Sequence, residues 1–282
     1  MIDTPFYSVG ICDVPSVDDG SLFHYTSFDN FMKIIQSMSL RSSPLFRMND
    51  LNEANLDFIQ WDNFLMTLDA ERYVKNECSV ICFSKNYSHG TYGQEGSNHP
   101  ALWAHYADNS NGVCIVLDRD SLLEINRELL LSIFYRFESV KYDFNCTPNI
   151  PIIKEGLNIS EFIHKYYKEL FFKKHTDWSY EGEERFFVEK SEVYLDIKGA
   201  IKYIVLGGKV SKENLKRLLT EMITPGNNLY HYFKFHSYAK VIPDIFGYMT
   251  VDAALDIKFE LEQMSKMSKL AEDYINWIDS NI

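Results

Sequence analysis

The sequence lacks most of the features that mark secreted, membrane-spanning or metal-binding proteins. Its five cysteines are scattered, with Cys78 and Cys82 the closest pair, so there is no disulfide framework and we expect reduced thiols and a cytoplasmic location. No spacing of Cys and His is typical of zinc, so no metal is expected. No apolar run is long enough to span a bilayer, and the N-terminus has neither the basic start nor the apolar segment of a signal peptide, so we expect no membrane partner.

The usual signatures of nucleotide binding and acyl transfer are also missing. Gly207 and Gly208 are adjacent but lack the remaining spacing of a Rossmann or P-loop motif, and no Ser or Cys stands in a nucleophile-elbow pattern. The net charge of -12, from 28 basic and 40 acidic residues, disfavours nucleic acid as a broad-surface partner, although Lys165 to Lys174 forms a local basic stretch.

What the sequence does contain is typical of a globular protein: 282 residues, 46% hydrophobic and 15% aromatic. Strand-like and helix-like segments alternate, which predicts an α+β fold, a single domain at 21–250 whose central mixed or antiparallel sheet, whole or split, is flanked by helices. We expect an irregular N-terminal arm at 1–20 and a C-terminal helix at 251–282. The elements that bear most on function are strands at Leu22–Thr26, Leu40–Phe46, Ser79–Phe83 and Gly112–Asp118, helices at Phe28–Ser37 and 56–74, and a long loop at Lys85–Pro100.

The densest group of charges on an apolar background is the segment Trp178-Ser-Tyr-Glu-Gly-Glu-Glu-Arg-Phe-Phe-Val188. If this segment is a strand, Glu181, Glu183 and Arg185 point to one face and Glu184 to the other, because side chains alternate along a strand. Such charges are costly to bury unless they pair with one another or serve a site. Two interpretations remain open: an edge strand whose charges face water, and a functional site.

A series of short blocks covers roughly residues 20–225. The blocks are Leu22-Phe-His-Tyr-Thr-Ser27, Leu40-Arg-Ser-Ser43 with Met48-Asn-Asp50, Ile81-Cys-Phe-Ser84, Ala101-Leu-Trp-Ala-His-Tyr-Ala107, Gly112-Val-Cys-Ile-Val-Leu-Asp118, Trp178-Ser-Tyr-Glu-Gly-Glu-Glu-Arg185 and Ile204-Val-Leu-Gly207. Together they resemble the bacterial domain of unknown function family 2971, whose name implies no function. Leu51 and Glu184 depart from the family's usual pattern, in which a proline and an aromatic residue are common at these positions.

The order of these elements is also similar, more distantly, to the ADP-ribosyltransferase plan. The shared features are an early strand with His beside an aromatic residue, a middle strand that ends in Ser, and a late strand with Glu. The resemblance implies a sheet that clasps NAD as the substrate, and a small-molecule nucleotide or a protein acceptor as the partner. His24 would bind a ribose, Tyr25 or Tyr106 would stack on the nicotinamide, and Glu183, or else Glu181, would accept a hydrogen bond from the ribose 2′-hydroxyl. A fixed carboxylate there stabilises the positive charge that builds on the ribose as the glycosidic bond breaks.

The resemblance gives a set of expected site residues. Glu183, Glu181 and His24 are the expected catalytic residues. The other expected contacts are His24, Tyr25, Thr26, Ser84, Tyr106 and Arg185 for NAD, and Asn49, Asp50, Glu53 and Trp103 for the substrate. Several of these have ordinary alternatives, because Asn and Asp often cap helices and a serine is common where a strand enters a loop.

Two further expectations follow from this set. We expect His24 and Glu183 to line one cleft, and Lys85–Pro100 to be weakly ordered until a ligand binds. Glu183→Gln should lower turnover roughly 100-fold with little change in stability.

Three functions from different classes remain open. The first is an NAD-using ADP-ribosyltransferase or NAD glycohydrolase, of the kind that serves as a bacterial toxin or antiphage effector. The second is a non-catalytic ligand- or protein-binding module in which the charged strand is an interface. The third is another hydrolase that uses Glu181 and Glu183 as acid and base, although residues two apart on a strand lie only about 6 to 7 Å apart at Cα.

Overall fold

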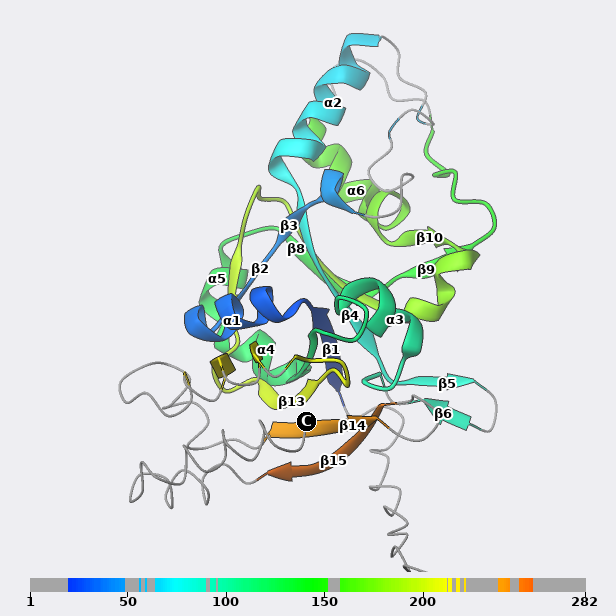
Figure 1. Ribbon diagram of the computed structural model, residues 1–282. Coiled ribbons are helices and arrows are strands. Elements are labelled where there is room, and N and C mark those ends of the chain that lie inside the picture. The colour runs from blue at the N-terminus through cyan, green and yellow to red at the C-terminus, as the bar shows by residue number, and fades with distance from the viewer. Residues whose placement is uncertain are drawn as a thin grey trace, which may run out of the picture. The chain divides into compact units, whose positions relative to one another are not determined.

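The computed structural model describes residues 20–48, 56, 59, 64–89, 92–94, 96–151, 158–211, 213, 214, 217, 218, 221, 238–243 and 249–255. The chain divides into two compact units. Unit 1 comprises Met1–Met32, Asn86–Val116 and Lys202–Ile282, and unit 2 comprises Lys33–Lys85 and Leu117–Ile201. Helices and mostly antiparallel strand pairs occur together, which confirms the α+β prediction (Figure 1). None of the described helices is both long and apolar enough to cross a membrane.

Unit 1 is built on a row of strands in the order β15-β14-β13-β7-β1. Their bounds are Met249–Leu255 for β15, Tyr238–Pro243 for β14, Ile201–Leu206 for β13, Val113–Asp118 for β7 and Ser21–Thr26 for β1. Strand β7 reads Val-Cys-Ile-Val-Leu-Asp, and its first five residues are fully buried, as a run of strand-forming apolar residues predicts. Helix α1 (Phe28–Ser37) follows β1, and the Ser27 hydroxyl accepts a hydrogen bond from the amide of Asn30 at 3.3 Å, which confirms the predicted N-cap.

The tail differs from the sequence prediction. Residues 251–255, predicted as the start of a helix, belong to β15, which pairs antiparallel with β14, for example Thr250 with Ile242 and Val251 with Val241. Residues four apart lie on one face of a helix and also on one face of a strand, so the apolar pattern of this segment is compatible with both structures. The antiparallel pairing with β14 shows that these residues form a strand. The rest of the predicted helix, 256–282, lies outside the described residues, as do residues 1–19 of the predicted arm.

The predicted loop at Lys85–Pro100 contains a short hairpin. Strands β5 (Tyr87–His89) and β6 (Tyr92–Gln94) pair antiparallel within it, so the prediction of a loop without strands is wrong (Figure 1). Helix α3 (Pro100–Tyr106) follows, and begins with a proline at its first turn.

Unit 2 has a three-strand row in the order β4-β11-β8, with the short β3 also on β4. The strands are β3 (Ser43–Pro44), β4 (Ser79–Lys85), β8 (Tyr135–Ser139) and β11 (Glu183–Val188), and two shorter pairs are β2 (Ser39–Arg41) with β12 (Tyr194–Asp196) and β9 (Lys141–Asp143) with β10 (Lys173–His175). The predicted strand Leu40–Phe46 is thus divided into β2, β3 and the 3-10 helix η1 (Leu45–Arg47). Strand β3 ends at Pro44, which has no amide hydrogen to continue a ladder.

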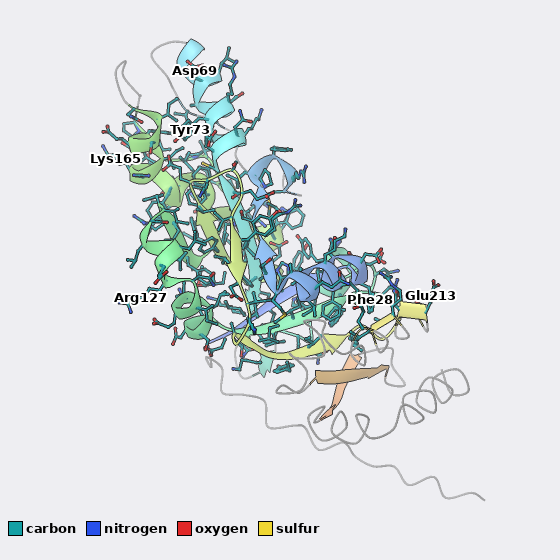
Figure 2. The ribbon with its side chains drawn as sticks, turned by 90° about the vertical axis from the view of Figure 1, so that its left-hand side faces the viewer. Phe28, Asp69, Tyr73, Arg127, Lys165 and Glu213 are labelled. Atoms are coloured by element: carbon teal, nitrogen blue, oxygen red, sulfur yellow. The ribbon has the colours of Figure 1, made fainter. Side chains whose placement is uncertain are left out.

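The helices of unit 2 cover its core. They are α2 (Phe64–Glu77), α4 (Arg119–Ile125), α5 (Arg127–Leu131), α6 (Ile159–Phe171) and the 3-10 helix η2 (Thr176–Glu181). Ala70 and Val74 of α2 and Phe162 of α6 belong to one buried apolar cluster with Phe187 of β11, and Tyr73 and Lys165 mark the two helices in Figure 2. Helix α2 is described from Phe64 onward. Within the helix predicted at 56–74, the described residues Leu56 and Ile59 are buried but not helical, and 57, 58 and 60–63 lie outside the described residues.

Candidate functional site

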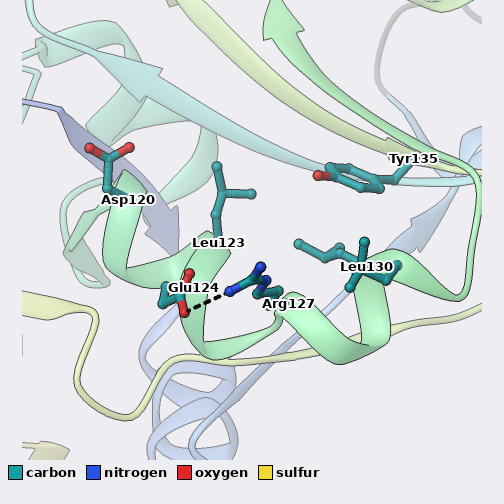
Figure 3. Close-up of a pocket in the computed structure, with 7 residues that line it drawn as sticks. Asp120, Leu123, Glu124, Arg127, Leu130 and Tyr135 are labelled. Atoms are coloured by element: carbon teal, nitrogen blue, oxygen red, sulfur yellow. Dashed lines mark ion pairs between the residues drawn. The ribbon is translucent and has the colours of Figure 1, made fainter.

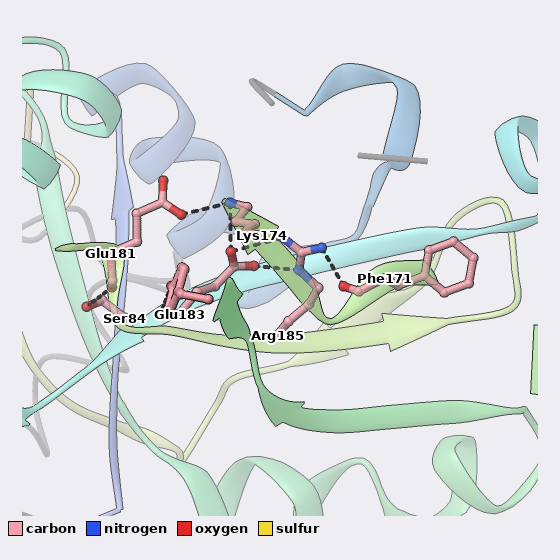
Figure 4. A network of polar contacts seen from close by, with 7 residues as sticks. Ser84, Phe171, Lys174, Glu181, Glu183 and Arg185 are labelled. Atoms are coloured by element: carbon pink, nitrogen blue, oxygen red, sulfur yellow. Dashed lines mark hydrogen bonds and ion pairs between the residues drawn. The ribbon is translucent and has the colours of Figure 1, made fainter. Parts of the chain in front are cut away.

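Four charged side chains of unit 2 form one buried cluster, which we call the charged quartet: Lys174, Glu181, Glu183 and Arg185. The Lys174 ammonium lies 2.7 Å from a carboxylate oxygen of Glu181 and 2.8 Å from one of Glu183. Arg185 donates two hydrogen bonds to Glu183, from Nε at 2.5 Å and from Nη2 at 2.9 Å. Figure 4 shows Lys174 between the two carboxylates. All four side chains are at most 6% exposed, so each charge is held by its neighbours and not by water.

A sharp turn in the chain positions the two carboxylates. Glu181 ends η2, Gly182 adopts the left-handed conformation with φ 51° and ψ 43°, and Glu183 begins β11. A residue with a Cβ rarely adopts this backbone, which is why a glycine suits the position. Ser84 of β4 faces Glu183 across the ladder, and its hydroxyl donates to the Glu181 carbonyl at 2.7 Å. The prediction that Glu181 lies on the strand is therefore wrong, although its carboxylate still joins the cluster.

The edge-strand interpretation of this segment is contradicted by the pairing. Strand β11 has antiparallel partners on both sides, β4 and β8, and Glu183 and Arg185 are buried. Their shared face is confirmed by the hydrogen bonds between them. Arg185 also bonds to the protein backbone, because its Nη1 donates a hydrogen bond to the Phe171 carbonyl at 2.6 Å. A buried ion pair is tolerated when further hydrogen bonds satisfy the charged groups, as here.

The electrostatic environment keeps Glu183 ionised. Burial alone would raise the pKa of its carboxyl, but the charges of Arg185 and Lys174 outweigh burial and lower the pKa from 4.5 to about 2. Its backbone amide donates to the hydroxyl of Tyr142 at 2.9 Å. Burial, with the Glu183 and Glu181 charges nearby, raises the pKa of Tyr142, so this phenol stays protonated.

Glu184 projects to the opposite face of β11, as the alternation predicts, and joins a separate network. It accepts a hydrogen bond from the Ser139 hydroxyl at 2.6 Å, and Ser139 in turn accepts one from the Lys85 ammonium at 2.6 Å. Arg119 lies 3.5 Å from the other carboxylate oxygen of Glu184 and covers the ring of Phe137. Lys85 and Arg119 are partly exposed, so water reaches this network but not the quartet.

The expected ligand contacts of unit 1 are largely structural. Tyr25 and Trp103, predicted to bind cofactor and substrate, are buried and pack edge to face at 5.1 Å. The Tyr25 hydroxyl donates to the Gly96 carbonyl and the Trp103 indole to the Ser97 carbonyl at 2.8 Å. These bonds fix the end of the Lys85–Pro100 segment without a ligand. The described end is therefore held by protein contacts, whereas the predicted ordering of the rest on ligand binding stays a prediction.

The other expected site residues divide by location. Thr26 is buried, and His24 and Tyr106 are half-buried, all in unit 1. Asn49, Asp50 and Glu53 lie outside the described residues. The structure thus brings together Ser84, Glu181, Glu183 and Arg185 in unit 2, and Tyr25 with Trp103 in unit 1. A shared cleft between His24 and Glu183 stays a prediction.

Lys174 is the residue that sequence reasoning missed. It lies in β10, in register with Tyr142 of β9, and is 5% exposed, whereas its neighbour Lys173 pairs with Glu169 on α6. The sequence marks Lys165 to Lys174 only as a local basic stretch. The signal that could have identified Lys174 is its position just before the charged segment, among Phe171, Phe172 and Trp178, where a buried cation needs a carboxylate partner.

A separate open cavity of about 440 Å³ lies on α4, α5 and the start of β8 (Figure 3). Its lining includes Leu123, Leu130 and Tyr135 with the ion pair of Glu124 and Arg127 at 3.7 Å. The volume suits a small molecule, since such pockets span roughly 300–1,000 Å³. No predicted site residue lines it, and its charged pair is mostly exposed, so it is not part of the candidate site.

The candidate site shows no sign of a metal centre. Within the described part of the chain, no group of three or more His, Cys, Asp or Glu side chains is arranged to hold a metal ion. The carboxylates of the quartet bind cations of the protein itself, Lys174 and Arg185.

Comparison with known proteins connects this site to a family. Residues 102–186 match the family described as Protein of unknown function (DUF2971). The match contains the whole charged quartet and the sequence blocks at Gly112–Asp118 and Trp178–Arg185, while the blocks at Leu22–Ser27 and Ile204–Gly207 lie outside it. No curated protein and no solved structure matches the chain. The resemblance to this family is supported over the matched residues, and the similarity to ADP-ribosyltransferases has no match behind it.

Proposed function

We propose that this chain is an enzyme that cleaves the bond between nicotinamide and ribose in NAD and passes ADP-ribose to an acceptor or to water. The reaction comes from the order of sequence motifs, which is similar to that of ADP-ribosyltransferases. The observation that carries the proposal is the pair of buried carboxylates, Glu181 and Glu183, held on either side of Gly182 at the start of β11. NAD is the substrate, and the acceptor is a small-molecule nucleotide or a protein.

The charge distribution of the quartet suggests which carboxylate acts on the substrate. Glu183 accepts hydrogen bonds from both Arg185 and Lys174, so its negative charge is matched by two cations. Glu181 forms an ion pair with Lys174 and ends η2, outside the strand. The proposal therefore gives Glu181 the role of stabilising the positive charge on the ribose, with Glu183 and Arg185 as its rigid support. The role of His24, which lies in unit 1, in binding a ribose of NAD stays a prediction.

The second candidate function is a non-catalytic binding module. The observation that favours it is the neutrality of the quartet, in which two carboxylates and two cations balance within a buried cluster. Such a cluster can hold η2 and β10 against β11 without any ligand. In this case the charges specify the fold, and binding occurs elsewhere on the surface. A role as a toxin or antiphage effector, and a cytoplasmic location, stay predictions.

The two candidates are separated by incubating the full chain with NAD. We expect free nicotinamide to appear, measured by chromatography, at a rate that rises when a suitable acceptor is added. Calorimetric titration with NAD is the companion measurement. Binding of NAD without nicotinamide release would favour the binding module, and absence of both release and binding would overturn the proposed use of NAD.

A further inference from the structure

We propose that Lys174 is a positioning residue, whose ammonium holds Glu181 and Glu183 together across Gly182 as one carboxylate pair. Its catalytic meaning rests on the proposed function, whereas the geometry that it concerns does not. Glu181 and Glu183 are separated in the chain by Gly182 alone, so their two negative charges repel each other, and this repulsion is strong where water is excluded. Lys174 removes the repulsion because its single nitrogen lies within 2.8 Å of an oxygen of each.

The contacts of Arg185 differ from those of Lys174. It grips Glu183 with two parallel hydrogen bonds and anchors its third donor on the Phe171 carbonyl. These contacts fix Glu183 on β11, whereas the ammonium of Lys174 contacts both Glu183 and Glu181. The division of labour follows from shape: a planar guanidinium suits one carboxylate, and a compact ammonium with three donors suits several acceptors.

The β9–β10 ribbon delivers Lys174 to this position. Lys174 is in register with Tyr142, and both side chains contact the start of β11. The Tyr142 hydroxyl accepts a hydrogen bond from the Glu183 amide. Lys173, one residue earlier, points elsewhere and pairs with Glu169 at 3.5 Å. The ribbon therefore provides two matched controls. Lys173→Met removes a lysine from the same strand, and Tyr142→Phe removes a neighbouring contact without changing the charge.

The test measures the pKa of the Glu183 carboxyl directly, by NMR of carboxyl-labelled glutamate in the full chain, with the signal assigned by its loss in Glu183→Gln. The groups that face this carboxyl are Lys174 from β10, Arg185 from β11, Glu181 from η2 and Tyr142 from β9. We expect Lys174→Met to raise the pKa by ~1 to 3 units, the effect of removing a close opposite charge. Lys173→Met and Tyr142→Phe should leave it within a few tenths of a unit of wild type.

A charge-balanced variant covers the case in which Lys174→Met fails to fold. Lys174→Met combined with Glu181→Gln keeps the neutral pair of Glu183 and Arg185, and its Glu183 pKa should still lie above that of wild type, because the close charge of Lys174 is gone. If the proposed function holds, the acid limb of the pH profile for nicotinamide release should also move to higher pH in Lys174→Met. A pKa rise in proteins that release no nicotinamide would support the role of Lys174 and overturn the proposed function alone. An unchanged Glu183 pKa in Lys174→Met would overturn the role of Lys174.

Discussion

The two faces of β11 carry charges of the same kind in different surroundings. On one face, Glu183 is paired with Arg185 and Lys174, whose side chains are 1% and 5% exposed. On the other, the partners of Glu184 are Arg119 and Lys85, which are 34% and 43% exposed. Adjacent residues of one strand therefore belong to a dry charge cluster and to a half-hydrated network. The contrast shows that a charged residue's energetic role is set by whether water can replace its partner.

The largest effect is expected on the dry face. Glu183→Gln removes one charge and leaves Lys174 and Arg185 with a single carboxylate between them, in a place where water cannot compensate. Breaking a buried pair in this way typically lowers the free energy of unfolding by about 3–5 kcal/mol. Denaturant unfolding of the variant and of wild type measures the change. A loss below about 1 kcal/mol would show that the quartet is more hydrated than its burial indicates.

This expectation corrects the one drawn from the sequence, that Glu183→Gln would affect turnover with little change in stability. Turnover of this variant must therefore be compared at matched concentrations of folded protein. The physical reason for the correction is that Glu183 accepts three hydrogen bonds from cations, which the sequence did not reveal.

The next effect concerns acid. The folded-state pKa of Glu183 is about 2, below the ordinary value of 4.5, so its ionised form stabilises the folded protein. This contribution is fully present above about pH 4.5 and is lost as the pH falls toward 2. Unfolding free energies measured across this range should fall more steeply in wild type than in Glu183→Gln. Other lowered carboxyls, such as Glu138, are present in both proteins and cancel in the difference. Parallel curves would contradict the assignment.

A smaller effect is expected on the hydrated face. Glu184→Gln keeps a hydrogen-bond acceptor for Ser139, and water can solvate Lys85 and Arg119 once the carboxylate is gone. The loss should be about 1 kcal/mol, the usual net value of one hydrogen bond. Equilibrium unfolding in urea gives the number. A loss as large as that of Glu183→Gln would remove the distinction between the two faces.

The smallest effect sets the baseline for a fully hydrated pair. Arg41 and Glu192 lie 3.4 Å apart with side chains 50% and 43% exposed. Arg41→Ala should change stability by no more than about 1 kcal/mol, because exposed ion pairs are screened by water. Thermal unfolding at low and at high salt would reveal any larger contribution, which would mean that exposure is a poor guide in this protein.

Much of the fold could be predicted from local sequence pattern. The strands at Ser79–Phe83 and Gly112–Asp118 are apolar runs of strand formers, and Ser27 before an amphipathic segment marks the start of α1. The pairing of Glu183 with Arg185 followed from the alternation of side chains. These features depend only on residues close together in the chain.

The remaining features depend on partners that are distant in sequence. Strand β11 lies between β4 and β8, so its charges are buried, whereas the sequence was equally consistent with charges that face water. The register of β9 with β10 places Lys174 beside these carboxylates as their counterion. The left-handed turn at Gly182 separates the 3-10 helix η2 from β11, where the sequence predicted one continuous strand. Glu181 therefore reaches the cluster from η2 and not from the strand. Residues 251–255 became a strand because β14 pairs with them. Local patterns did not contain this information.

The most direct test of the account is nicotinamide release from NAD by Glu181→Gln, compared with Glu184→Gln at matched folded concentration. Each change removes one negative charge, and the two positions are only three residues apart in the chain. Of the two residues, only Glu181 belongs to the proposed catalytic pair. The account predicts a loss of roughly 100-fold or more for Glu181→Gln, the effect of removing a preorganised stabilising group, and a change of a few-fold at most for Glu184→Gln. Equal rates for the two variants, or no release by the wild-type protein, would contradict it.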